Sequence, residues 1–235
     1  SRANISITVG ETPADANISA TVELPMTGSA GLVKDGPGEL VLDAINTYNG
    51  GTHVLEGALS TQQAGAVPGD IIVEQAATWN WNASGPSAFH GTLEGAGTFN
   101  VNVPGSLQLT AANTFTGTTN LAANMTLNVT GLPGSESSAQ LLGTINVMDG
   151  GILEGQGAFG DVHVHAGGLF EFGTRTVTGL PPATTLTAQN LMMDDGSGFV
   201  VGADFGSGSV SMLTVANEVH LDTGTIHGTV SHTNT

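Results

Sequence analysis

Residues 36–52, GPGELVLDAINTYNGGT, decide the fold of this chain. Leu40 and Leu42 fall on one face of a short strand, and Asn and Gly residues then make a turn before the next strand opens. Residues 105–119, GSLQLTAANTFTGTT, repeat residues 38–52 without a gap at an offset of 67 residues. Nine of the 15 aligned positions match when Tyr and Phe are counted together, so chance is a poor explanation of the likeness.

A second, shorter repeat points to the same architecture. LEGAGTF at residues 93–99 returns as LEGQGAF at residues 153–159, an offset of 60 residues. Recurring units of strand and turn predict a solenoid, because each unit buries its apolar face only by stacking on its neighbours. A closed sandwich or barrel stays open as an alternative, although it gives no reason for the same unit to recur.

The composition limits the kinds of partner. The chain has 235 residues, with three Lys and Arg against 20 Asp and Glu, and a formal net charge of −17. Binding to nucleic acid or to an anionic bilayer is excluded, because both need clustered basic side chains. The sequence has no cysteine, which suits a protein that crosses a membrane unfolded.

The sequence also suggests that the chain is part of something longer. It holds no signal peptide and no apolar run of 18 residues, and it begins with Ser1 rather than Met. We therefore expect a processed or excised segment. A soft boundary near Thr178 divides residues 1–177 from residues 178–235, which we expect to stack on the first part as further coils and a cap.

Alternation of apolar and polar residues predicts strands throughout, and apolar residues show no helical periodicity. Predicted strands include residues 4–9, 17–24, 53–60, 71–73, 186–194, 198–203, 209–215, 218–221 and 225–230, and predicted loops are residues 64–70, 82–88, 131–139 and 178–184. Because a β-helix has open edges at its first and last coil, residues 1–24 and 219–235 are expected to act as partial caps.

Three segments near the N-terminus carry a resemblance to a known family. GLVKDGPGELVL at residues 31–42 is followed by NTYNGGT at 46–52 and EGAL at 56–59. This pattern resembles the autotransporter-associated β-strand repeat, except that Ala44 stands where the family favours Gly. Residues 105–119 resemble a degraded copy. The resemblance implies an all-β, right-handed parallel β-helix, a single-stranded solenoid, exported by type V secretion.

The last third of the chain carries a second resemblance, on residues 151–162, 166–169, 186–191, 196–199 and 213–215. These segments are similar to the C-terminal, autochaperone-like part of autotransporter passengers, which folds first and helps the other coils to stack. The family usually has Pro-Gly after its Gly-Gly-Leu strand, whereas this chain has Glu171-Phe172-Gly173.

The resemblance implies a surface-exposed or secreted bacterial passenger segment that acts as an adhesin or structural rod. Expected partners are host surface or matrix molecules, glycans, or further copies of the chain. The expected link to a membrane is only through a translocator barrel that this sequence does not contain. We expect about ten coils of about 20–25 residues each. A passive stalk of a larger toxin or protease passenger is the main alternative. An ice- or mineral-binding solenoid would need regular Thr-x-Thr ladders, and the Thr positions here are irregular.

We expect no enzymatic activity, cofactor or metal. A carbohydrate-active β-helix enzyme, the remaining alternative, would need basic residues or converging carboxylates. Asp194-Asp195 predicts an acidic turn, because adjacent strand residues project to opposite faces. Neither a Gly-x-Ser-x-Gly motif nor a glycine-rich calcium-binding nonapeptide occurs.

Two tryptophans form the first candidate ligand-binding group. Trp79 and Trp81 share a strand face and are interleaved with Asn80 and Asn82. Outward-facing rings would make a sugar-stacking platform. The neighbouring asparagines instead favour a Trp pair that faces inward.

Two histidines form the second candidate group. His163 and His165 share a strand face with Asp161, opposite Val162 and Val164. Histidines at i and i+2 can chelate a transition metal. The sequence places no further ligand near them, which favours a solvated outer face. Three more histidines recur at spacings that fix no site: His220, His227 and His232.

Overall fold

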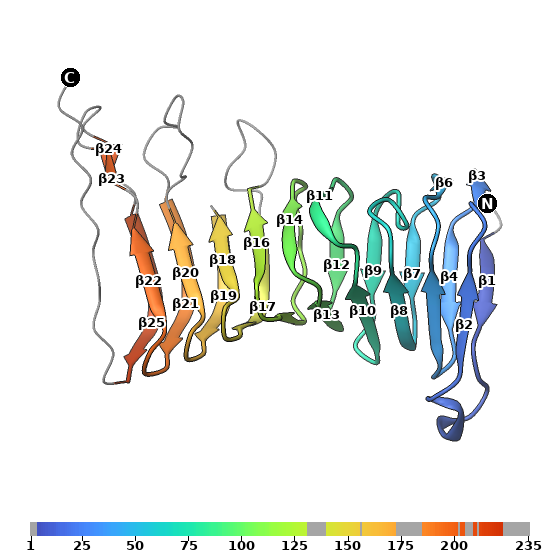
Figure 1. The fold of residues 1–235 in the computed structure, drawn as a ribbon, viewed down its shortest axis with the longest axis horizontal. Coiled ribbons are helices and arrows are strands. Elements are labelled where there is room, and N and C mark those ends of the chain that lie inside the picture. The colour runs from blue at the N-terminus through green and yellow to red at the C-terminus, as the bar shows by residue number, and fades with distance from the viewer. Residues whose placement is uncertain are drawn as a thin grey trace.

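The computed structural model describes residues 4–130, 140–155, 157–172, 185–201, 203–204, 209–210 and 212–222. In these residues the strands of successive coils lie side by side along one long axis, from β1 at one end to β22 and β25 at the other (Figure 1). Every strand pair in the three long sheets is parallel, with β-strands from successive coils as neighbours. The chain is a parallel β-helix, which confirms the all-β solenoid predicted from the repeats.

The described strands form three long sheets. The five-stranded sheet contains β1 (Ile5–Thr8), β4 (Leu32–Asp35), β7 (Thr52–Val54), β9 (Ile71–Val73) and β12 (Leu93–Gly95). The ten-stranded sheet contains β2 (Ser19–Val22), β5 (Glu39–Leu42), β8 (Gly57–Thr61), β10 (Ala77–Trp81), β13 (Thr98–Val101), β15 (Thr118–Leu121), β17 (Gln140–Val147), β19 (Gly157–Val164), β21 (Thr185–Met193) and β25 (Met212–Leu221). The six-stranded sheet contains β11 (Gly85–Phe89), β14 (Gly105–Leu109), β16 (Met125–Val129), β18 (Ile152–Gly155), β20 (Leu169–Phe172) and β22 (Gly198–Val201).

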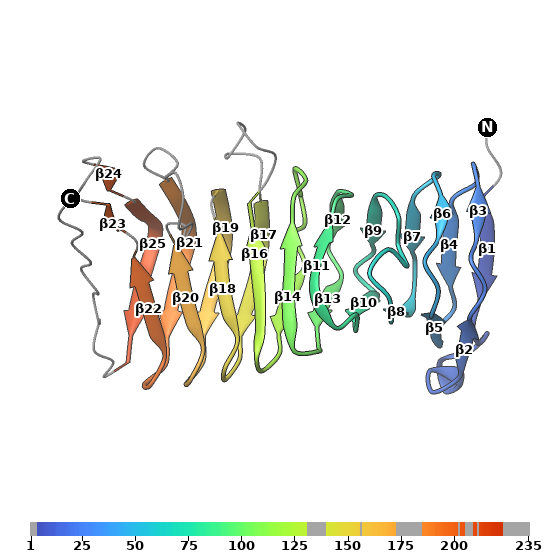
Figure 2. The same cartoon turned by 45° about the horizontal axis from the view of Figure 1, so that its top comes forward.

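Two short pairs and one helical turn complete the described elements. β3 (Thr27–Gly28) pairs with β6 (Thr47–Tyr48) in parallel, and β23 (Ala203–Asp204) pairs with β24 (Ser209–Val210) in antiparallel orientation. A 3-10 turn, η1 (Pro13–Asp15), lies between β1 and β2. No helix in the described part of the chain is long and apolar enough to cross a membrane. The six-stranded and ten-stranded sheets form two layers in the second half of the molecule (Figure 2).

The coils are regular in the first half and uneven in the second. From β2 to β15, paired residues of the ten-stranded sheet lie 19 or 20 positions apart in the sequence. Measured near the C-terminal ends of the strands, the next four spacings are 26, 17, 29 and 28 positions. The ten strands of this sheet agree with the expected number of coils. The longer spacings mean that segments are inserted between strands that still pair in parallel, with shifts of register in the pairs β17–β19 and β21–β25.

One continuous cluster of apolar side chains runs through the stack. It includes Trp79 and Phe99, which are paired residues of β10 and β13 and stack with ring centroids 4.6 Å apart. Phe89 and Trp81 meet the Trp79 ring edge-on at centroid distances of 5.1 and 5.7 Å. In-register stacking therefore places large rings on large rings, which fills the core locally.

The two long repeats are buried alike but lie on different faces of the coil. Leu40 and Leu42 belong to β5 in the ten-stranded sheet, whereas Leu107 and Leu109 belong to β14 in the six-stranded sheet, and all four are fully buried. The 67-residue offset is thus not a whole number of 20-residue coils. The repeated unit is a strand, a corner and a strand, and it fits more than one corner of the helix.

The repeated asparagine explains why this corner needs its sequence. Asn46 is buried, accepts a hydrogen bond from the Met26 N–H at 2.7 Å and donates one to the Ala66 carbonyl at 2.6 Å, so it joins the coils on both sides. Asn113, at the equivalent position, accepts from the Leu93 N–H at 2.8 Å. Both amides satisfy backbone groups that the turn leaves without strand partners.

Lys34 closes another corner of the first repeat. Its side chain is buried, and Nζ donates to the carbonyls of Asp35, Gly36 and Glu56 at 3.1, 2.7 and 2.8 Å. Three acceptors match the three N–H donors of an ammonium group. Desolvation lowers the pKa of Lys34, and the charges of Asp35 and Glu56 act in the opposite direction.

Three predictions made from the sequence need correction. The loop at residues 82–88 is wrong in its second half, where β11 begins at Gly85; Pro86 is tolerated because β11 is an edge strand of its sheet. The strand at residues 53–60 is divided into β7 and β8 by a corner. Residues 4–24 do not cover the first coil, because they form a coil themselves, with β1 and β2 paired to β4 and β5.

Several other predictions lie outside the described residues. These are the boundary near Thr178, the loops at residues 131–139 and 178–184, the strand at residues 225–230, and residues 223–235 of the second cap. Within the described part, β21 pairs with β19, so the ten-stranded sheet contains paired strands from before and after residues 173–184.

Gly97, Gly117, Gly143 and Gly160 form a column in which each glycine after Gly97 lies against the one on the preceding coil, and this column gives a test of the stacking. A Cβ added at Gly143 would lie 1.8 Å from the carbonyl oxygen of Gly117 on the coil below. We expect Gly143→Ala to lower the free energy of unfolding by about 1–3 kcal/mol, because the coils must separate to admit the methyl group. Urea denaturation followed by Trp fluorescence measures this change.

Gly69→Ala is the matched control, because nothing lies within 4 Å of the Cβ added there. Its free energy of unfolding should stay within about 0.5 kcal/mol of the parent value. Equal effects of the two substitutions would contradict the close coil contact at Gly143.

Candidate functional site

A ladder of asparagines runs along the outside of the ten-stranded sheet. Asn80, Asn100, Asn120 and Asn146 occupy one register position on β10, β13, β15 and β17. Each amide donates to the side-chain oxygen of the preceding rung, at 2.9 Å from Asn100, 2.8 Å from Asn120 and 2.8 Å from Asn146. Asn80 donates in turn to the Ser60 hydroxyl at 3.1 Å. The outer face is therefore ordered, polar and uncharged along these coils.

The tryptophan pair is not part of this outer face. Trp79 and Trp81 are 0% and 1% exposed, whereas Asn80 and Asn82 are partly exposed on the opposite face of the same strand. The inward orientation favoured by the sequence is confirmed. A sugar-stacking platform made of the two rings is ruled out by their burial. Asn82 instead accepts a hydrogen bond from Asn102 at 3.1 Å, which starts a second, shorter row of amides.

The asparagine ladder ends at a histidine pair. His163 on β19 is in register with Asn146, and His165 follows two residues later on the same outer face. The rings of His163 and His165 lie 3.8 Å apart between centroids, at an angle of 37°. Val162 and Val164 are buried on the inner face, as the sequence predicted.

Asp194 joins the two histidines from the next coil. One carboxylate oxygen lies 2.7 Å from Nε2 of His163, and the other lies 3.1 Å from Nδ1 of His165. The three side chains are 28%, 31% and 33% exposed for His163, His165 and Asp194. The hydrogen bond from His163 is the main reason that the pKa of Asp194 lies below its ordinary value. The carboxylate is thus ionised and partly shielded.

His163 and His165 were predicted from the sequence as a possible metal-binding pair, but their partner was not. Asp194 was expected only as part of an acidic turn, and it does begin such a turn, with its carbonyl accepting from the Ser197 N–H at 3.1 Å. Asp161, the third outer residue of the predicted group, accepts a hydrogen bond from Asn190 and lies outside the cluster. His220 bonds Asp222 at 3.2 Å on β25, and His227 and His232 lie outside the described residues.

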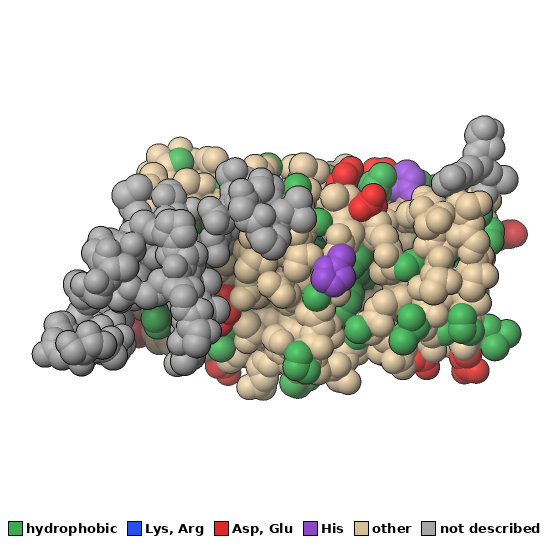
Figure 3. Space-filling view, turned by 90° about the horizontal axis from the view of Figure 1, so that it is seen from above, with side chains coloured by type: hydrophobic (Ala, Val, Ile, Leu, Met, Phe, Trp, Pro, Cys, Tyr) green, Lys and Arg blue, Asp and Glu red, His purple; other side chains and the backbone are tan. Residues whose placement is uncertain are grey.

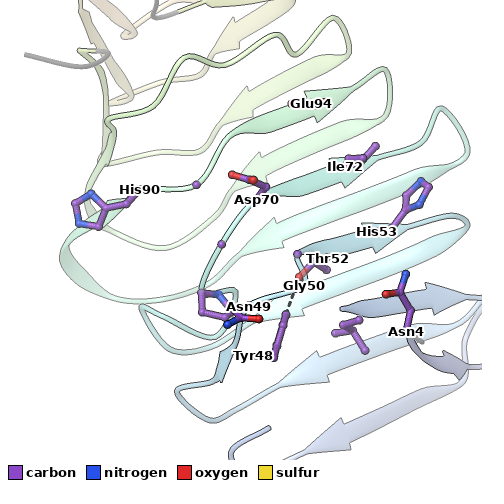
Figure 4. A pocket seen from close by; sticks show the side chains of 15 residues that line it. Asn4, Tyr48, Asn49, Gly50, Thr52, His53, Asp70, Ile72, His90 and Glu94 are labelled. Atoms are coloured by element: carbon purple, nitrogen blue, oxygen red, sulfur yellow. Dashed lines mark hydrogen bonds between the residues drawn. The ribbon is translucent and has the colours of Figure 1, made fainter. Parts of the chain in front are cut away.

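An open hollow of about 600 Å³ lies over the five-stranded sheet. In Figure 4, His53 and His90 stand at opposite ends of this hollow with Asp70 between them. These polar groups are already engaged: His53 pairs with Glu74 at 2.7 Å, His90 with Thr110 at 2.9 Å, and Asp70 accepts from the Thr92 N–H at 2.8 Å. This hollow was not predicted from the sequence, since its residues come from successive coils.

The face of the molecule that lies uppermost in Figure 1 is largely uncharged. Figure 3 shows backbone and uncharged polar side chains over most of its described area, with scattered acidic groups. The sequence has only three basic residues, and Lys34 among them is buried. This surface suits many weak polar contacts.

Comparison with known families identifies the repeat. The model of the passenger-associated-transport-repeat matches residues 32–60 and 104–123. The chain is an autotransporter passenger segment. In this passenger segment the first match begins with β4 and stops one residue before the end of β8. The second match covers β14 and β15. The resemblance drawn from residues 31–59 and 105–119 is confirmed.

A curated relative agrees with this assignment. Over 173 residues the passenger segment is 30% identical to a protein named "Adhesin BmaC autotransporter" from Brucella suis biovar 1 (strain 1330). The match covers 63% of this chain and 5% of that protein, so the segment spans a small part of the relative's length. No solved structure matches the chain significantly.

Tyr48 offers a direct probe of the first repeat, because it is the only tyrosine in the passenger segment. Its hydroxyl is buried and lies 2.6 Å from the Thr52 hydroxyl. Burial raises the pKa of Tyr48 to about 12. An ultraviolet titration of phenolate absorbance should show this value in the folded protein and a value of about 10 in urea.

The raised pKa also predicts how stability depends on pH. The folded state holds the Tyr48 proton more tightly, so this residue stabilises the fold fully below pH of about 10 and loses that contribution as pH rises to about 12. Tyr48→Phe, which copies Phe115 of the second repeat, should remove the titration and this part of the alkaline destabilisation. A folded-state pKa near 10 would contradict the burial of the hydroxyl.

Proposed function

We propose that this passenger segment is part of an adhesin, a rod at the bacterial surface that binds host glycans or matrix molecules along its polar faces. The observation that carries the proposal is the similarity over 173 residues to a protein named as an adhesin autotransporter. Membership of the autotransporter passengers implies export to the cell surface. The adhesive role and the ligand class are the parts that we propose.

The outer face of the ten-stranded sheet supports this role. Its amides repeat from coil to coil, at the spacing of about 4.8 Å between neighbouring strands. The partly exposed rungs Asn80, Asn100, Asn120 and Asn146 present amide groups that can bond sugar hydroxyls or a protein backbone. Many weak contacts in one row add up through effective concentration. A rigid row also loses little conformational entropy on binding.

The charge of the segment narrows the ligand class. Of its three basic residues, Lys34 is fully buried and bonds only backbone carbonyls, while the chain carries 20 Asp and Glu. Strongly anionic ligands such as sulfated glycans would be repelled by the net charge. Neutral glycans and basic regions of matrix proteins fit this surface better.

A binding screen tests the adhesive role. The folded segment, immobilised on beads, is presented to neutral glycans, sulfated glycans, matrix proteins and host cells. We expect saturable binding to neutral glycans or matrix proteins that is lost when the segment is unfolded by heat. Sedimentation velocity over a range of protein concentrations tests whether the segment also binds further copies of itself.

A pair of variants connects the binding to the ladder. Asn100→Thr with Asn120→Thr alters two central rungs and should weaken binding at least about tenfold, since both amides leave the row. Ser106→Thr with Gln108→Thr, on the outside of β14, is the matched control and should leave binding unchanged. A folded segment that binds no member of the panel and stays monomeric would overturn the adhesive role and favour a passive stalk.

A further inference from the structure

We propose that His163, His165 and Asp194 form a binding site for a late first-row transition-metal ion, with Cu²⁺ bound most tightly. Nε2 of His163, Nδ1 of His165 and a carboxylate oxygen of Asp194 all lie within 4.8 Å of one another. Two imidazoles and one carboxylate are a donor set for Cu²⁺, Ni²⁺ and Zn²⁺ rather than for Ca²⁺ or Mg²⁺.

The β-helix positions these donors before any ion binds. His163 lies on the outer face of β19, His165 directly follows the last residue of that strand, and Asp194 comes directly after β21, which pairs with β19. The Asp194 N–H donates to the Val164 carbonyl at 2.9 Å, so its backbone continues the sheet. His165 and Asp194 thus stand one residue beyond paired strands, and their N–H groups are bonded to the preceding coils, which keeps the conformational entropy lost on binding small.

The distances fit a metal with a small rearrangement. Ligand atoms about 2.0–2.1 Å from a tetrahedral ion lie about 3.3 Å from one another. The present N···O separations are 2.7 and 3.1 Å, the lengths of hydrogen bonds that an ion would replace. Small rotations of the two rings and the carboxylate bring all three donors to the required separation. The partial exposure of all three side chains leaves open positions for water or a ligand.

The neighbouring side chains favour copper. On the outer face of the ten-stranded sheet, Met192 of β21 is the register partner of His163. Met148 directly follows Val147, and His165 directly follows Val164, the register partner of Val147, so Met148 and His165 are neighbours. Met192 and Met148 are 43% and 36% exposed, on the same outer face as the two histidines. Thioethers are soft ligands that suit copper as Cu⁺, while the general affinity order of divalent ions places Cu²⁺ above Zn²⁺ at nitrogen and oxygen donors. Two exposed methionines beside two histidines thus strengthen the assignment.

The site would join two coils. His163 lies on β19, and Asp194, 31 residues later, directly follows β21, the next strand of the ten-stranded sheet. An ion that binds only the folded stack stabilises it by an amount that grows with the logarithm of the ion concentration once this exceeds the dissociation constant. Bound metal would therefore hold β19 and β21 together and raise the unfolding temperature of these coils.

Titration of the complete segment with CuCl₂, ZnCl₂ and CaCl₂ tests the proposal, using protein without a polyhistidine tag. We expect one Cu²⁺ per chain, weaker Zn²⁺ binding and no Ca²⁺ binding, by calorimetry and by equilibrium dialysis. Electron paramagnetic resonance of the Cu²⁺ form should show two coordinated imidazoles. The unfolding temperature should rise with Cu²⁺ concentration.

Variants decide whether the ion sits at this cluster. His163→Gln should lower the Cu²⁺ affinity about 100-fold and leave one imidazole signal, and Asp194→Asn should lower it at least about tenfold. His53→Gln is the matched control, a surface histidine that pairs with a single carboxylate, Glu74. Circular dichroism verifies that each variant is folded.

The results for the two histidine variants distinguish a site at this cluster from binding to scattered histidines. Loss of the two-imidazole signal in His163→Gln together with unchanged binding in His53→Gln supports the site. Unchanged Cu²⁺ affinity in His163→Gln, or an equal loss in His53→Gln, overturns it and assigns the binding to scattered histidines.

Discussion

The close stacking of one coil on the next is the constraint on which the whole structure depends. Parallel backbone hydrogen bonds hold neighbouring strands about 4.8 Å apart, and the corners must come equally close. At Gly97, Gly117, Gly143 and Gly160 an added Cβ would lie 1.8 to 2.3 Å from the nearest atom of the preceding coil. Glycine at these corners is what lets the strands on both sides stay in register. Each side chain then stands above the side chain in the same position one coil earlier.

This vertical alignment turns each register position into a column with its own chemistry. Inside, Trp79 stacks on Phe99; outside, amide follows amide from Asn80 to Asn146. At His163 the outer column changes from amides to imidazole without a change of backbone geometry. The scaffold that supports an ordered polar surface along most coils thus creates a cluster of metal-ligating groups at one place.

Much of this fold could be predicted from residues 36–52, because their alternation, their corner asparagine and their glycines are local signals. Trp79 and Trp81 were correctly expected inside, since each adjoins an asparagine on the opposite strand face. Asp194 could not be found in this way. Its distance of 31 residues from His163 exceeds the 20-residue coils of the first half, so counting coils along the sequence would have paired the histidine with another residue. β11 was not predicted, because proline is typical of a loop and Pro86 is tolerated in a strand only at the edge of a sheet.

The sequence by itself determined the solenoid class, the alternation of inner and outer residues and the family of the chain, because all three rest on contacts within one strand-corner-strand unit. Only the tertiary structure decided which face each repeat occupies, which outer residues form ladders, and that Asp194 completes the group begun by His163 and His165. Those features depend on the register between coils. That register is set by the lengths of the inserted segments and by stacking over the whole column, and no single unit carries this information.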